Sequence, residues 1–327
     1  MSGFVDRLKE SKLLLPPLAG YTDYPYRRIL SEFDPPFICS EMISSEALVR
    51  ENQRTMEMVK MVEGNHLNGV QLVGSDAKSM QKAAVIVEAM GYDYIDINMG
   101  CTIKTVTRTG AGLALMSDED KAVSVASAMI EEVDIPVTCK MRMGLTAATK
   151  NATSLSRQMA EVGVSAITIH GRTGEKKFGL VMDLDGIKEV VDSVDVPVIA
   201  NGGVYTGEEA VNLLDATGAA AVMPGRGLIG NPWLVKGIRS SLSDIKTPGP
   251  DLDERKEVAM RHLNYLCEFY GERSGVILMR RLLGKYFSGC RNAGQLKLDG
   301  QKTGTIDDVV VLIERIRDAD GMRYLRP

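Results

Sequence analysis

The feature that most constrains this chain is an alternation of short apolar runs with longer amphipathic segments. Eight runs predict β-strands, at residues 12–15, 36–40, 69–73, 94–98, 136–141, 166–170, 196–201 and 220–224. Segments between them predict helices, over residues 77–90, 118–132, 152–162, 184–193 and 207–216. Apolar strands that alternate with helices are typical of a parallel sheet buried on both faces. Eight such units predict an α/β fold, the (β/α)8 TIM barrel.

The pattern changes after residues 247–251, which read Thr-Pro-Gly-Pro-Asp and interrupt any helix. Beyond them the strand pattern stops, and residues 252–270, 276–288 and 306–318 carry apolar side chains at helical spacing. We therefore predict two domains, a barrel over residues 1–246 and a helical bundle over residues 251–327.

Composition excludes several classes of protein. The 327 residues are 44% hydrophobic and 25% charged, too apolar for a disordered chain. The five cysteines are widely spaced and form no C-x-x-C pair, which disfavours a disulfide framework or a zinc knuckle. The sequence has no signal-peptide core and no uncharged apolar run of about 18 residues. These observations predict a cytoplasmic protein without a membrane span.

The net charge of −4 argues against general nucleic-acid binding. The charge is unevenly divided, however: residues 1–250 carry 25 basic and 31 acidic side chains, whereas residues 251–327 carry 14 and 12. Residues 273–302, here called the basic segment, hold seven cations and a single acidic residue, Asp299. This segment is interpreted either as a solvated helix face or as a stripe that faces phosphates.

Two glycine-rich strand ends indicate an anion site. Asn201, Gly202 and Gly203 end the seventh predicted strand, and Gly225 and Arg226 follow the eighth. In a (β/α)8 barrel the loops after these two strands commonly hold a phosphate, and Arg226 adds a forked cation. One such loop would be an ordinary tight turn, but the pair favours a phosphate site.

Four other predicted strands carry a polar residue at or toward their carboxyl ends, namely Gln71, Asn98, Lys140 and His170. A lysine within an apolar strand is costly to bury without a partner. Lys140 either extends to the solvent at the rim or stabilises negative charge on a cofactor or substrate. No cluster of His, Asp or Glu shows metal-ligand spacing, so we expect no metal site.

Cys101 lies just after the fourth predicted strand, in a loop that also holds Lys104 and Arg108. A thiol with an ordinary pKa is mostly protonated at neutral pH and can act as a general acid. Nearby cations would favour the thiolate and a nucleophilic role instead. The spacing of residues leaves both roles open.

These motifs, in this order, resemble the tRNA-dihydrouridine synthases. The resemblance rests on residues 15–23 (LPPLAGYTD), 96–101 (DINMGC), 140–144 (KMRMG), 170–173 (HGRT), 201–203 (NGG) and 225–226 (GR). It implies FMN-dependent reduction of the C5–C6 double bond of specific tRNA uridines, with NADPH reducing the flavin. Hydride would pass from flavin N5 to C6, and Cys101 would donate a proton to C5.

The same resemblance implies roles for individual residues. Pro17, Leu18 and Ala19 would support the flavin ring, Gln71 would bond its pyrimidine edge, and Lys140 would lie near N1 and O2. The ribityl-phosphate arm would be held by His170, Asn201, Gly202, Gly203, Gly225 and Arg226. The uridine substrate would meet Asn98 and Arg172, and the C-terminal bundle would bind tRNA.

The chain departs from the family pattern at three positions: Thr102 replaces the usual proline, Leu18 replaces methionine, and Gly203 replaces an acidic or polar residue. None removes a reactive group. Two other functions are compatible with parts of the pattern. One is another FMN barrel oxidoreductase that acts on a small molecule, similar to dihydroorotate dehydrogenase, and the other is a non-catalytic tRNA-binding relative.

Overall fold

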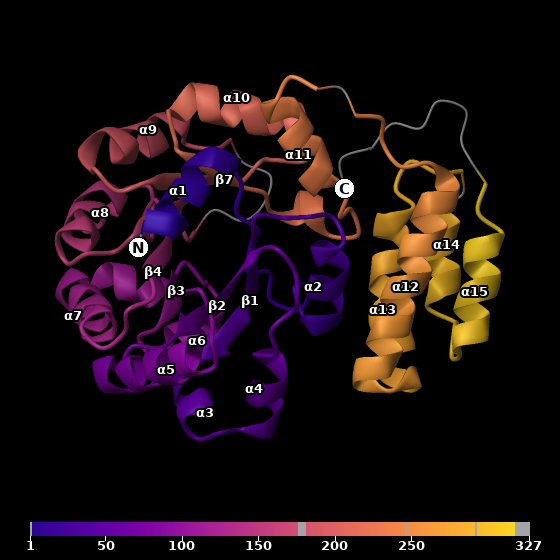
Figure 1. Ribbon diagram of the computed structural model, residues 1–327, viewed down its shortest axis with the longest axis horizontal. Coiled ribbons are helices and arrows are strands. Elements are labelled where there is room, and N and C mark those ends of the chain that lie inside the picture. Colours follow the sequence, from indigo (N-terminus) through magenta and orange to yellow (C-terminus); the bar gives the residue numbers. More distant parts are fainter. Residues whose placement is uncertain (1, 176–180, 246, 292, 318–327) are drawn as a thin grey trace.

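The structure, a computed structural model, describes residues 2–175, 181–245, 247–291 and 293–317. Figure 1 shows two parts side by side: a curled parallel sheet ringed by helices, and a group of C-terminal helices, α12 to α15. Each part has its own buried apolar side chains, and the two meet along helices α2 and α12. Within the described ranges, no helix combines the length and the apolar character needed to cross a membrane.

The sheet contains seven parallel strands that pair in sequence order. They are β1 (Phe37–Ser44), β2 (Leu67–Val73), β3 (Tyr94–Met99), β4 (Val137–Arg142), β5 (Ala166–His170), β6 (Val198–Asn201) and β7 (Ala221–Met223). Each strand has a counterpart among the predicted runs from residue 36 onward. The α/β barrel-type fold is therefore confirmed.

The first predicted strand, residues 12–15, is reduced to a single bridge between Leu13 and Val222 of β7. The Val222 carbonyl accepts from the Leu14 amide at 3.1 Å, and the Val222 N–H donates to the Lys12 carbonyl at 2.9 Å; these two bonds make up the bridge. Lys12 has a left-handed φ of 51° on one side, and two prolines follow at residues 16 and 17. Because proline has no N–H group to donate, pairing ends there.

The amino-terminal end of the barrel is closed by α1 (Ser2–Ser11). Its Phe4 ring lies 5.2 Å from the Phe37 ring and 5.1 Å from the Tyr94 ring. Phe37 and Tyr94 are the first residues of β1 and β3, and Ala166 and Ala221, in the same buried cluster, are the first residues of β5 and β7. A packed plug at this end leaves the carboxyl ends of the strands as the place for a site.

The five helices predicted between strands are confirmed: α5 (Ala77–Ala89), α7 (Glu119–Ile130), α8 (Ala152–Glu161), α9 (Leu184–Ser193) and α10 (Gly207–Thr217). They lie next to one another in an arc around the outside of the sheet (Figure 1). Shorter helices were not predicted, namely α2 (Tyr24–Ser31), α3 (Ser45–Val49), α4 (Gln53–Met58), α6 (Lys104–Thr107) and α11 (Leu234–Leu242).

The C-terminal part consists of α12 (Leu252–Tyr270), α13 (Glu272–Tyr286), α14 (Ala293–Gly300) and α15 (Ile306–Glu314). The predicted helix at 252–270 matches α12, and α13 begins four residues before its predicted start. α15 ends at residue 314, and the predicted end at 318 lies outside the described residues. α14 was missed because it is short and begins and ends beside glycines, so its apolar face is weakly marked.

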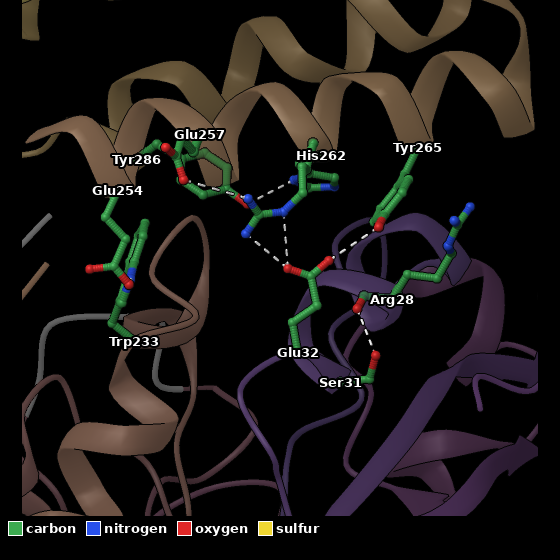
Figure 2. Close-up of polar contacts among 10 residues, drawn as sticks. Arg28, Ser31, Glu32, Trp233, Glu254, Glu257, His262, Tyr265 and Tyr286 are labelled. Atoms are coloured by element: carbon green, nitrogen blue, oxygen red, sulfur yellow. Dashed lines mark hydrogen bonds and ion pairs between the residues drawn. The ribbon is translucent and has the colours of Figure 1, made fainter. Parts of the chain in front are cut away.

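A polar cluster joins the bundle to the barrel (Figure 2). The Glu32 carboxylate, just after α2, accepts from Arg261 Nε and Nη2 at 3.1 and 3.0 Å. It also accepts from the Tyr265 hydroxyl at 3.2 Å. The buried His262 ring stacks on Tyr26 of α2, with 5.0 Å between ring centroids. Because α2 follows directly on residues 16–23, the bundle is anchored beside the mouth of the barrel.

Candidate functional site

The strand register gathers the polar side chains on the inner face of the sheet. Gln71 pairs with Asp96, which pairs with Thr138. One step nearer the carboxyl end, Asn98 pairs with Lys140. Since paired residues of a parallel sheet point to the same face, this register collects their polar groups at the carboxyl end of the barrel.

A cavity of about 180 Å³ opens at this end of the barrel. Its lining combines cations with glycine-rich backbone: Lys140, Arg142, His170, Arg172, Arg226, Gly202, Gly203, Gly225, Asn201, Val204, Tyr205, Pro16, Pro17 and Leu18. No carboxylate occurs among these described lining residues. The four cationic side chains of the lining, Lys140, Arg142, Arg172 and Arg226, predict an anionic ligand.

Burial and mutual repulsion shape the protonation states in this cavity. Burial, together with the nearby Arg142 guanidinium, lowers the pKa of Lys140 to about 8. Burial and the surrounding cations, Lys140 and Arg142 among them, lower the pKa of His170 to about 2. His170 is therefore neutral at physiological pH, and its ring can exchange hydrogen bonds without adding charge.

The loop after β6 brings main-chain groups to the cavity. Gly202 and Gly203 both have positive φ, at 121° and 71°. A Cβ at Gly202 would lie 3.0 Å from a ring carbon of His170. Only glycine fits this backbone conformation at such close approach. The preceding residue, Asn201, accepts from Lys140 Nζ at 2.8 Å and donates to the Met223 carbonyl at 2.8 Å.

Cys101 lies in the loop that follows β3, partly exposed to solvent. Its backbone N–H donates to Asn98 Oδ1 at 2.9 Å, and the Gly100 N–H donates to the same oxygen at 3.2 Å. Arg142 Nε donates to the Gly100 carbonyl at 2.8 Å. Since Arg142 also lines the cavity, the cysteine loop is attached to the cavity wall.

A buried polar network lies beneath this loop. Gln71 Nε2 donates to Asp96 Oδ2 at 2.7 Å, and Asn98 Nδ2 donates to Gln71 Oε1 at 2.6 Å. Asp96 is only 4% exposed, and burial raises its pKa. The sequence prediction missed Asp96, although its position two residues before Asn98 on one strand places both side chains on the same face.

The structure groups most of the predicted residues around one cavity. The lining includes Pro17, Leu18, Lys140, His170, Arg172, Asn201, Gly202, Gly203, Gly225 and Arg226. Four predicted residues lie outside that lining: Ala19, Gln71, Asn98 and Cys101. The prediction missed Arg142, whose signal was its spacing of two from Lys140 on the same strand. No group of three or more His, Cys, Asp and Glu side chains that could hold a metal occurs within the described ranges.

A parallel barrel with a cationic cavity at the carboxyl ends of its strands, and a cysteine loop attached to the cavity wall, belongs to the class of α/β-barrel enzymes. Residues 14–314 match the family model for dihydrouridine synthase (Dus). The chain therefore belongs to the dihydrouridine synthase family, a family of flavin-dependent oxidoreductases, and the resemblance seen in the sequence is confirmed.

Relatives of known family agree over most of their length. The chain is 35% identical to a probable tRNA-dihydrouridine synthase of Rickettsia bellii over 88% of this chain and 89% of that protein. It is 35% identical to tRNA-dihydrouridine synthase B of Pasteurella multocida, over 86% and 85%. It is 37% identical to a probable tRNA-dihydrouridine synthase of Rhodobacter capsulatus, over 84% and 85%. Among solved structures, the Amycolatopsis orientalis BexX/CysO complex aligns with a TM-score of 0.49 at 13% identity, over 74% of this chain and 93% of that chain.

Proposed function

We propose that this enzyme reduces the C5–C6 double bond of specific uridines in tRNA to dihydrouridine, with FMN as its bound cofactor and NADPH as the reductant. The observation that carries the proposal is the family match, which spans the barrel and the bundle together. The relatives named as tRNA-dihydrouridine synthases are matched over at least 84% of this chain. A small-molecule barrel enzyme would not need the bundle.

The cavity fits FMN by the chemistry of its donor set. The phosphate requires cations and N–H groups, and the lining offers Arg226 and the backbone around Gly203 and Gly225. A Cβ built on Gly225 meets nothing within 4 Å, so the backbone there is open to a ligand. The neutral His170 would exchange hydrogen bonds with the ribityl chain, and Pro17 and Leu18 would lie against the flavin ring.

When bound and reduced, FMN would supply the hydride that uracil C6 accepts. Cys101 would give the thiol proton to C5, so that both atoms of the former double bond gain a hydrogen. Asn98 holds the backbone of this cysteine and would orient the uracil. Lys140 would stabilise negative charge at the flavin N1 and O2. The target base must leave the base stack to reach the cavity.

The bundle reaches the loops that form the cavity, which supports a substrate that contacts both parts. A Cβ at Gly230 would lie 2.6 Å from the Cβ of Lys285 on α13. Burial, together with the cations Lys297 and Arg226, lowers the pKa of Lys285. Lys285 therefore extends the positive field of the cavity onto the bundle, where Arg172 and the basic segment would meet tRNA phosphates.

The role of Cys101 is tested by Cys101→Ala. We expect this variant to form no dihydrouridine in tRNA while it keeps its flavin absorbance near 450 nm. Cys267→Ser is the matched control, because Cys267 is the other partly exposed cysteine and lies on α12. Normal turnover by Cys101→Ala would refute the assignment of the proton donor.

The phosphate assignment is tested by Arg226→Ala. We expect its FMN dissociation constant to rise by at least about tenfold, since a charge-assisted hydrogen bond contributes about 1.5–3 kcal/mol. Arg50→Ala serves as the control, because the Arg50 side chain is 78% exposed and lies on the outer surface. An unchanged FMN affinity in Arg226→Ala would show that Arg226 does not bind the FMN phosphate.

A further inference from the structure

We propose that Asp96 is a positioning residue that fixes the backbone around Cys101. It acts through the side-chain amides of Gln71 and Asn98, which form a directed chain of hydrogen bonds. The inference rests on the proposed function, which assigns the proton donation to Cys101.

This chain of hydrogen bonds begins at the Asp96 carboxylate, a group that can only accept hydrogen bonds. Asp96 Oδ1 accepts from the Thr138 hydroxyl at 2.7 Å, and Oδ2 accepts from Gln71 Nε2 at 2.7 Å. Both oxygens are used as acceptors, and the carboxylate is the form of this side chain that offers acceptors alone. The side chain is 4% exposed, so solvent does not supply competing partners.

A carboxylate at this position decides which way each amide points. Because Gln71 presents its NH2 group to Asp96, its carbonyl oxygen faces the Asn98 NH2 group at 2.6 Å. Asn98 therefore turns its own oxygen toward the loop, where it accepts from Cys101 N and Gly100 N at 2.9 and 3.2 Å. An amide that lacks a directing partner can adopt either orientation.

The reversed orientation would break the loop. It would place the Asn98 NH2 group against two backbone N–H groups, which are also donors, and both would lose their acceptor. The thiol lies on the residue whose N–H is held in this way. The orientation of the Gln71 and Asn98 amides thus fixes the position of the Cys101 backbone, and with it the point from which the thiol side chain extends.

A different interpretation gives Asp96 a purely electrostatic role toward the cationic cavity. The two are separated by Asp96→Asn. In that variant the amide oxygen can still accept from Gln71, while its NH2 group donates to the Thr138 hydroxyl oxygen. The Thr138 hydroxyl can then donate its own hydrogen bond to the Ile95 carbonyl, which lies 3.3 Å away. The amide chain survives and the charge is lost.

The experiment measures alkylation of Cys101 by iodoacetamide in purified, flavin-containing protein that carries Cys267→Ser. The remaining cysteines, Cys39, Cys139 and Cys290, are buried. Asp96→Val removes both acceptors and keeps a branched side chain, and Asp96→Ala replaces it should the valine variant not fold. Thr217→Val is the matched control, because it deletes a buried hydroxyl at the end of α10 that bonds the Leu213 carbonyl and the Ala219 N–H.

We expect Asp96→Val to raise the alkylation rate about fivefold, the equivalent of one lost hydrogen bond, and to lower dihydrouridine formation. Asp96→Asn and Thr217→Val should stay within about twofold of the parent in both measurements. An unchanged rate in Asp96→Val, or an equal defect in Asp96→Asn, would overturn the inference. Alkylation needs neither tRNA nor NADPH, so a parent enzyme that forms no dihydrouridine would refute the proposed function without affecting this test.

Discussion

Replacement of Lys140 by methionine should stabilise the flavin-free protein while it weakens flavin binding. Lys140 points into a partly buried cavity whose other charged lining residues are arginines. Its ammonium donates to Asn201 Oδ1 at 2.8 Å. Burial, with the nearby Arg142, lowers its pKa from 10.5 to about 8. The charged form of Lys140 is therefore less stable in the folded protein than in the unfolded chain.

The size of the effect follows from that change in pKa. A fall from 10.5 to about 8 corresponds to about 3 kcal/mol of destabilisation at pH 7, where the lysine is charged in both states. Methionine removes this cost but also removes one hydrogen bond, which contributes about 1 kcal/mol. We therefore expect a net gain of about 2 kcal/mol in the free energy of unfolding at pH 7.

The sign of the pH dependence is fixed by the same shift. Above pH 8 the folded parent loses the Lys140 proton while the unfolded chain keeps it, so the parent becomes more stable as pH rises toward 10.5. The advantage of Lys140→Met should shrink across this window. Urea unfolding at several pH values measures it, with Lys188→Met as the control, because the Lys188 side chain is 55% exposed. An advantage that does not change with pH, or a less stable variant at pH 7, would refute the reasoning.

Three further variants test contacts within the bundle and between the bundle and the barrel. Glu32→Ala should lower the free energy of unfolding, measured by urea denaturation, by about 1–2 kcal/mol. The reason is that Arg261 loses both of its hydrogen bonds to this carboxylate. An unchanged free energy of unfolding would show that this ion pair contributes nothing to stability. Tyr286→Phe should lower the free energy of unfolding by about 1–3 kcal/mol in the same assay, since it removes the hydroxyl that lies 2.9 Å from the buried His262 Nδ1. An unchanged free energy of unfolding would mean that the imidazole finds another hydrogen-bond partner. Arg281→Met should release flavin faster in a fluorescence assay, because Arg281 donates to the carbonyl of Gly20, next to residues 17–19, which we propose support the flavin ring. Unchanged release would show that this contact does not affect flavin binding.

Periodicity was sufficient to predict the barrel because its strands are buried on both faces and its main helices are amphipathic. It failed where other constraints act. Residues 12–15 have a strand-like sequence, but the left-handed Lys12 and the prolines that follow limit them to one bridge. The helix α14 was missed because an eight-residue segment bounded by glycines shows little apolar periodicity.

The candidate site was predictable to the extent that chemistry follows strand ends. Lys140 and the glycine loops lie around one cavity because parallel strands end at the same edge. Asp96 was not predicted, since a carboxylate within an apolar strand has meaning only through its neighbours across the sheet. The direction of the Gln71 and Asn98 amides depends on those cross-strand contacts, which a linear sequence does not contain.

The basic segment 273–302 shows how charge counted along a sequence differs from charge available to a ligand. Arg280 and Arg281 donate to backbone carbonyls, and Lys302 pairs with a carboxylate one turn earlier. Arg280 thus holds the bundle together, Arg281 holds it against the barrel, and the charge of Lys302 is offset by Asp299. Lys285 is partly buried beside the cations of the cavity.

Without Arg280, Arg281 and Lys302, at most four cations of the basic segment, Lys285 among them, remain to neutralise tRNA phosphates. Each phosphate contact contributes about −0.7 to −0.9 to the slope of log affinity against log salt, so the segment alone would contribute no more than about −4. Neither the solvated-face nor the phosphate-stripe interpretation predicts that two of the arginines that make the sequence basic hold the bundle together and against the barrel.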